Sequence, residues 1–182
     1  KIIEERLEQN LSSIRKYDKI STLTSFVCNI GEYSLSQSKR LVRINNEGYD
    51  CLALTVRNLF ELSLLLNYHL NMSEKDLFLQ LAKEYKRDRL EIESCIAYLD
   101  HKLSNKKSDE FTDIDFSDSN KTPNIYSLAK YCGAEDEYKR MYKIYSKYIH
   151  PSAYLLFGDE EETYSKSVKF IFIMRAVDYL RD

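Results

Sequence analysis

Residues 48–71 read GYDCLALTVRNLFELSLLLNYHLN, and this stretch decides the fold of the chain. Leucines, a valine and a phenylalanine occupy every side of the helical wheel that it would form. A helix that is apolar all round is normally buried in the middle of a bundle. We therefore predict that Gly48 to Asn71 forms a central helix around which the rest of the chain packs.

Two charged residues lie inside the apolar part of this stretch, residues 52–66. Arg57 and Glu61 are four positions apart, so both side chains project from one face of the helix. Charges in a core helix are costly unless they are paired. The two residues are therefore either a structural ion pair that holds helices in register, or part of a ligand-binding or catalytic site, and the sequence leaves both open.

The composition favours long helices with few breaks, because the 182 residues include only 4 Gly and 2 Pro. We predict an all-α fold in one domain over residues 1–182, a single bundle of about five to seven helices. Within it, the polar and acidic segment 105–121 is predicted to be a mobile loop. Because the chain opens on Lys1 rather than Met, we expect it to be trimmed or part of a longer protein.

The net charge, the cysteines and the histidines limit the partners and cofactors that we expect for the chain. The net charge of -2 gives no global attraction for nucleic acid or membranes, so such a partner would need a local patch. The four scattered Cys predict reduced thiols in a cytoplasmic protein. The three His are isolated, so we expect no metal and no cofactor, and His69 and His101 are expected at the surface or a boundary. No apolar run is long enough to span a bilayer.

Apolar residues at helical spacing continue on the N-terminal side of the central stretch. Residues 1–30 are predicted to form one amphipathic helix or two, ending near Gly31, because glycine is a favoured residue just after a helix. Beyond it, Lys39, Arg40 and Arg43 make a short basic run. A solvated helix face is the commonest role of such a run.

Two short segments carry a resemblance to known proteins. One is VRNLFE at residues 56–61, in the leucine-rich helix, and the other is YSKYIHPS at residues 145–152, within Ile125–Ser152. Together they resemble a poorly characterised family of bacterial all-helical proteins with an Arg-x-x-x-Glu helix and a later Tyr-Ser-x-x-x-His motif. That family looks like a branch of the HEPN superfamily of helical bundles. The resemblance spans residues 49–152.

The resemblance implies a range of functions. HEPN proteins are commonly dimeric, and many are metal-independent ribonucleases of toxin–antitoxin, abortive-infection and other phage-defence systems, whereas others bind or scaffold without catalysis. Active members carry Arg, four to six residues and then His near the end of a helix. His150 matches that His, but the positions for the Arg hold Lys143, Ile144 and Tyr145. Whether the chain is an enzyme, a metal-independent endoribonuclease, is therefore left open.

Cleavage of RNA without a metal needs a base for the 2′-OH and cations for the phosphorane charge. Histidine is the side chain best suited to the base or acid role near neutral pH, so His150 is the candidate for it. Arg57 or Lys143 would stabilise the charge, and Glu61 would orient Arg57. The candidate catalytic residues are His150, Arg57, Lys143, Glu61 and Ser146, and the candidate binding residues are Tyr145, Lys147 and Asn58.

Functions of different classes remain open. The leading one is an HEPN-like bacterial defence or toxin-type protein that binds or cleaves RNA without a metal. Its expected partners are RNA, a second copy of the chain, and a cognate antitoxin or adjacent domain, with no membrane. The alternative is a non-catalytic interaction or scaffold module whose Arg57–Glu61–His150 network is structural. A third is a sensor of a small molecule or nucleotide, bound in a pocket beside Arg57.

Overall fold

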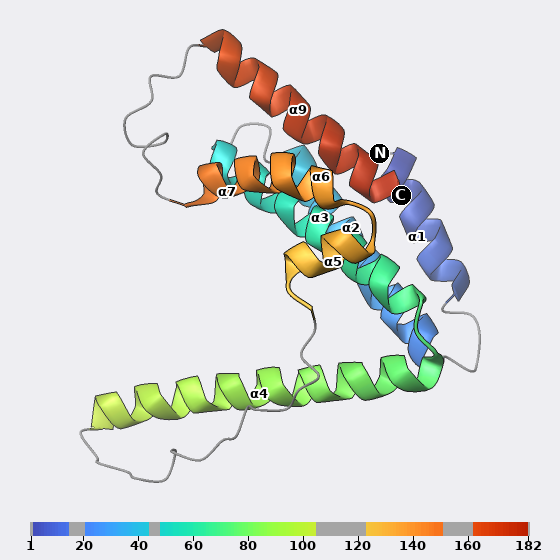
Figure 1. The fold of residues 1–182 in the computed structure, drawn as a ribbon, viewed down its shortest axis with the longest axis vertical. Coiled ribbons are helices and arrows are strands. Elements are labelled where there is room, and N and C mark those ends of the chain that lie inside the picture. Colours follow the sequence, from blue (N-terminus) through green and yellow to red (C-terminus); the bar gives the residue numbers. More distant parts are fainter. Residues whose placement is uncertain (1, 15–20, 44–47, 105–122, 151–161, 182) are drawn as a thin grey trace. The chain divides into compact units, whose positions relative to one another are not determined.

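The computed structural model describes residues 2–14, 21–43, 48–104, 123–150 and 162–181. Within these ranges the secondary structure is helical and contains no strand, which confirms the predicted all-α class (Figure 1). The predicted mobile loop at 105–121 lies outside the described residues. The helices are α1 (Ile2–Ile14), α2 (Thr22–Arg43), α3 (Tyr49–Leu70), α4 (Glu74–Ser104), α5 (Ile125–Tyr131), α6 (Glu135–Glu137), η2 (Tyr138–Tyr142), α7 (Lys143–Ile149) and α9 (Glu162–Arg181).

The chain divides into two compact units. One comprises Lys1–Asn71 with Asn124–Asp182, and the other comprises Met72–Pro123. The second unit contains α4, a helix of 31 residues, which begins where the Ser73 hydroxyl accepts a hydrogen bond from the Asp76 N–H at 3.2 Å. The first unit contains the other helices. A single domain over residues 1–182 stays a prediction.

The predicted central helix is α3. It packs against α2, α5, α7 and α9 (Figure 1). Its apolar side chains enter two core clusters, one shared with α7 and α9 and one shared with α5. Burial on several faces explains why the sequence of α3 lacks a polar side. The buried α3 residues are Leu52, Ala53, Thr55, Val56, Leu59, Phe60, Leu64 and His69.

The segment η2–α7 runs antiparallel to α3. The ring of Tyr49, at the start of α3, lies 6.1 Å from the ring of Tyr148, near the end of α7. Two turns further along α3, Arg57 bonds to Tyr142, at the end of η2. This direction determines which residues of the two predicted motifs can meet.

Helix α2 continues through Gly31, so the predicted helix end there is wrong. A Cβ atom built on Gly31 would lie 3.0 Å from Cδ2 of Leu11, on α1. The glycine therefore allows α1 to approach α2 closely. Close packing between helices, rather than a terminating turn, accounts for this residue.

Several features bear on binding chemistry. None of the described helices is both long and apolar enough to cross a membrane. Among the described residues, no group of three His, Cys, Asp or Glu side chains could hold a metal ion. All four cysteines fall within the described ranges, and none forms a disulfide.

Candidate functional site

A hydrogen-bonded triad joins α3 to η2. Arg57 Nε donates to Glu61 Oε1 at 2.9 Å, and Arg57 Nη2 donates to the Tyr142 hydroxyl at 2.6 Å. The Tyr142 hydroxyl donates in turn to Glu61 Oε1 at 2.9 Å. Each member of the triad is thus bonded to the other two.

The triad is mostly shielded from water, since the side chains of Arg57 and Glu61 are 24% and 27% exposed. Burial, followed by the hydrogen bond to Glu61, raises the pKa of Tyr142 to about 12. Burial alone would lower the pKa of Arg57. Its hydrogen bond to Glu61 and the adjacent Tyr142 outweigh this effect, so the pKa of Arg57 is raised overall. At neutral pH the triad therefore holds a guanidinium cation and a neutral phenol.

Aromatic packing holds the Tyr142 ring in place. The Tyr138 and Tyr142 rings stack with centroids 4.7 Å apart, and the Phe60 ring lies 6.0 Å from that of Tyr142. The Arg57 guanidinium carbon lies 4.7 Å from the centroid of the Tyr142 ring, a cation–π distance. These tyrosines form the ends of η2, a π-helical turn, and such turns are frequent at functional sites.

The sequence interpretation missed a second polar network, between residue 137 and α9. Glu137 Oε1 accepts hydrogen bonds from Arg175 Nε at 2.9 Å and from the Tyr179 hydroxyl. Arg175 Nη1 also donates to Asp178 Oδ2 at 2.9 Å. The available signal was Arg175 itself, the one charge in the apolar run FIFIMRAV at residues 170–177. Like Arg57, Arg175 is a charge in an apolar helix and is costly there unless it is paired.

Tyr145, a predicted binding residue, belongs to this second network. Its side chain is fully buried, and its hydroxyl lies 3.2 Å from the Tyr179 hydroxyl. Burial raises the pKa of Tyr145 to about 12 and also raises the pKa of Tyr179. Tyr145 therefore faces the core of the bundle.

Other predicted residues lie on the outer side of α7. Lys143, Lys147 and His150 are spaced at i, i+4 and i+7, and all three are exposed. Tyr145 and Tyr148, on the opposite side, are buried. We call Lys143, Lys147 and His150 the α7 edge. It presents two ammonium groups and one imidazole on a common side of the helix.

The end of α7 follows from Pro151, which disfavours helical geometry in the residue before it. His150 is accordingly the C-cap, with an extended backbone (φ -102, ψ 147), and its N–H donates to the Ser146 carbonyl at 3.2 Å. The Ser146 hydroxyl donates to the Tyr142 carbonyl at 3.0 Å. The Ser146 hydroxyl thus bonds to the helix backbone rather than to His150.

Residues 40–164 match a family of unknown function, DUF5677, over well more than half of the chain. The chain belongs to this family. Comparisons with curated proteins and with solved structures gave no match.

The DUF5677 match contains both the triad and the α7 edge. Arg175 and Tyr179, of the second network, lie after its last residue. Because the family has no assigned function, membership alone does not choose between the functions that the sequence leaves open. The choice depends on where the structure places the candidate residues.

The structure divides the predicted site into two groups. Arg57 and Glu61 meet Tyr142, and His150 lies eight positions further along η2–α7, a separation of about 12 Å along an ideal helix. In the described part of the chain, no hydrogen bond or ion pair joins His150 to Arg57 or Glu61. Within one copy of the chain, Tyr142 rather than His150 completes the charged pair.

The remaining predicted polar residues fall elsewhere. Asn58 is half-buried next to Arg57 on α3. His69 is 2% exposed, so its predicted position at the surface or a boundary is wrong. The Phe26 ring of α2 lies 5.0 Å from the His69 ring and helps to cover it, and Nδ1 of His69 lies 2.8 Å from the Leu65 carbonyl oxygen. The side chain of His101 lies outside the described part.

Proposed function

We propose that the chain is an HEPN-like cytoplasmic protein of bacterial defence or toxin type that binds RNA along the α7 edge. The observation that supports this function best is the common exposure of Lys143, Lys147 and His150. Lysines bind phosphates without regard to sequence, and such contacts dominate affinity for nucleic acid. Because the net charge is -2, a local cationic edge is the feature that RNA binding requires.

In the proposed cleavage of RNA, His150 acts as the general base. The imidazole takes the proton of a ribose 2′-OH, whose oxygen attacks the adjacent phosphorus. A cyclic phosphate forms as the bond to the 5′-oxygen breaks, and that oxygen leaves as a hydroxyl group after taking a proton from solvent water. Lys143 and Lys147 stabilise the phosphorane charge. No metal takes part in this reaction.

Arg57 has a different role in this proposal, although the sequence placed it among the catalytic candidates. Its guanidinium donates to both Glu61 and Tyr142. Lys143 directly follows Tyr142 in the chain. Arg57 and Glu61 therefore act as positioning residues, which hold the turn from which the α7 edge begins.

A second copy of the chain is the proposed protein partner, and α9 offers a surface for it. Phe170, Ile173, Met174 and Val177 are spaced at i, i+3, i+4 and i+7 and are 38–65% exposed. An exposed apolar stripe of this kind marks an interaction surface. A cognate antitoxin or an adjacent domain is the further partner expected of this class of protein.

The proposed dimer is tested by light scattering on purified protein. We expect the mass of a dimer for the wild type and of a monomer for Met174→Asp. Tyr131→Asp, which also adds a charge at an exposed position but lies on α5, should leave the dimer intact. A wild-type monomer, or equal dissociation by both substitutions, would contradict the α9 surface.

RNA binding and cleavage are tested with a single-stranded RNA oligonucleotide in EDTA. We expect the wild type to bind and cleave it, His150→Ala to bind without cleaving, and Lys143→Gln/Lys147→Gln to bind weakly. The control is Lys130→Gln, an exposed lysine of α5, which should behave as the wild type. Absence of RNA binding by the wild type, or equal loss in the control, would contradict the proposal.

A non-catalytic interaction module is the second candidate, and the closed triad favours it. Arg57, Glu61 and Tyr142 satisfy one another and are largely shielded, as buried structural ion pairs are. For such a module, no RNA would be bound or cleaved, and substitutions in the triad would lower stability alone. The RNA experiment therefore separates the two candidates.

A further inference from the structure

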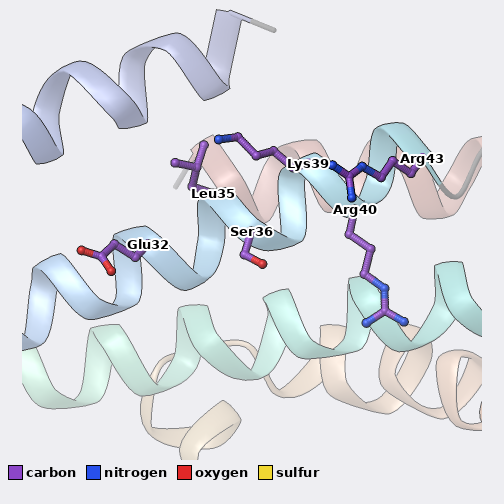
Figure 2. Close-up of a pocket in the computed structure, with 6 residues that line it drawn as sticks. All are labelled: Glu32, Leu35, Ser36, Lys39, Arg40 and Arg43. Carbon is purple, nitrogen blue, oxygen red and sulfur yellow. The ribbon is translucent and has the colours of Figure 1, made fainter.

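A groove of about 480 Å³ runs along α2, on a helix that neither the triad nor the α7 edge uses. Figure 2 shows side chains that line it on successive turns of this one helix, with the Arg43 guanidinium extending back along α2. Its volume falls in the range of small-molecule sites. The lining residues are Glu32, Leu35, Ser36, Lys39, Arg40 and Arg43.

Three cationic residues, Lys39, Arg40 and Arg43, line one end of the α2 groove. Lys39 pairs with Glu8 of α1 at 2.8 Å, and both side chains are about half exposed. Arg40 and Arg43 are exposed and have no carboxylate partner among the described residues. A guanidinium presents a planar fork of N–H donors that matches the oxygens of a phosphate group. Figure 2 shows the two guanidinium groups extending in different directions from adjacent turns of α2. Because both residues line the same end of the groove, this end favours an anionic group.

The other end of the α2 groove carries a negative charge, that of Glu32. Glu32 lies eight residues before Arg40, about 12 Å along the helix axis. A carboxylate repels a phosphate but accepts hydrogen bonds from hydroxyl and amino groups. Leu35 and Ser36 lie between the two ends and provide an apolar surface and a hydroxyl. A ligand with a phosphate at one end and hydrogen-bond donors at the other matches this order.

We propose that the α2 groove binds a mononucleotide. Its phosphate lies on Arg40 and Arg43, and the hydroxyl or amino groups of its ribose or base donate to Glu32. Arg40 and Arg43 also lie in the last turn of α2, where cations stabilise a helix without any ligand. Substitution of these two residues could therefore change the stability of α2 without any ligand, so the test must measure binding of the nucleotide.

The test is isothermal titration of the purified chain with AMP and, separately, with inorganic phosphate at low salt. We expect saturable binding of AMP to the wild type and about tenfold weaker binding of phosphate. Arg40→Gln and Arg43→Gln should each weaken AMP binding about tenfold, because each removes charge-assisted hydrogen bonds. Glu32→Gln should weaken binding of AMP but not of phosphate.

The matched control is Lys130→Gln, which removes an exposed charge on α5 and should leave AMP binding unchanged. Circular dichroism of each variant reports that its helices are retained. No saturable binding of AMP by the wild type would overturn the proposal, as would an equal loss in Lys130→Gln. Phosphate binding as tight as that of AMP would overturn the assignment to a nucleotide.

Discussion

Arg57 Nη2 lies 2.6 Å from the hydroxyl of Tyr142, a residue 85 positions later in the chain. The same hydroxyl donates to Glu61, so one phenol group joins both charged members of the triad on α3 to η2. The bond therefore fixes the register between α3 and the segment that leads into α7.

Removing this hydroxyl should destabilise the bundle. Tyr142→Phe keeps the stacked ring but loses the hydrogen bonds to Arg57 and Glu61. We expect the free energy of unfolding in urea to fall by about 1–3 kcal/mol. The control is Tyr138→Phe, which removes a hydroxyl from the other ring of the stack and should change stability by less than about 0.5 kcal/mol. Equal effects of the two substitutions would contradict a specific role for the Tyr142 hydroxyl.

The Arg57–Glu61 pair should show an interaction energy of its own. A double-mutant cycle with Arg57→Met and Glu61→Gln measures it, because the cycle isolates the term that both partners share. For a pair that is about three-quarters shielded, we expect a coupling of about 1 kcal/mol. A coupling near zero would show that the two charges do not interact in solution.

The second network should be as sensitive as the triad. Arg175→Met removes the guanidinium that donates to Glu137 and leaves this carboxylate with the Tyr179 hydroxyl. We expect a loss of about 2 kcal/mol in the free energy of unfolding. Arg181→Met, at a position where the side chain is 70% exposed, should have little effect. If Arg175→Met is as mild as Arg181→Met, the network does not contribute to stability.

Alkaline pH should weaken the fold through the buried phenols. The pKa of Tyr142 rises from its ordinary value of 10.0 to about 12 in the folded chain. The folded chain therefore keeps a proton that the unfolded chain loses, and stability must fall as pH rises. We expect this contribution to be complete below about pH 10 and to be lost between about pH 10 and about pH 12.

Urea unfolding of wild type and Tyr142→Phe across this pH range measures the contribution of Tyr142. The difference in stability between the two proteins should shrink as pH rises. The Tyr145 phenol, whose pKa is also raised to about 12, is present in both proteins and cancels in the comparison. A difference that stays constant with pH would contradict the raised pKa of Tyr142.

Much of the fold could be predicted from local pattern. The apolar wheel of residues 48–71 predicted a buried central helix, which α3 is. The Arg57–Glu61 spacing predicted that the two side chains would share a face, and they bond. Pro151 disfavours helical geometry in the residue before it, and α7 accordingly ends with His150 as its C-cap. In each case the signal lies within a few residues of the feature.

The remaining features depend on residues that are distant in sequence. Tyr142 joins the triad through the register of two antiparallel helices, which no local pattern specifies. Gly31 lies in the middle of α2, where the absence of a side chain leaves room for Leu11 of α1. His69 is buried because Phe26 of α2 lies against it. Tertiary packing overrode local preference at these positions.

Binding of RNA along the α7 edge should show in the salt dependence of the affinity of the chain for RNA. The logarithm of the association constant for a single-stranded RNA should fall linearly with the logarithm of salt concentration. Lys143→Gln/Lys147→Gln should reduce the magnitude of this slope by about 1.4, because each phosphate contact to a single strand contributes about 0.7. Lys130→Gln should leave the slope unchanged. A slope that both lysine substitutions leave unaltered, or a wild type without measurable affinity for RNA, would contradict the claim.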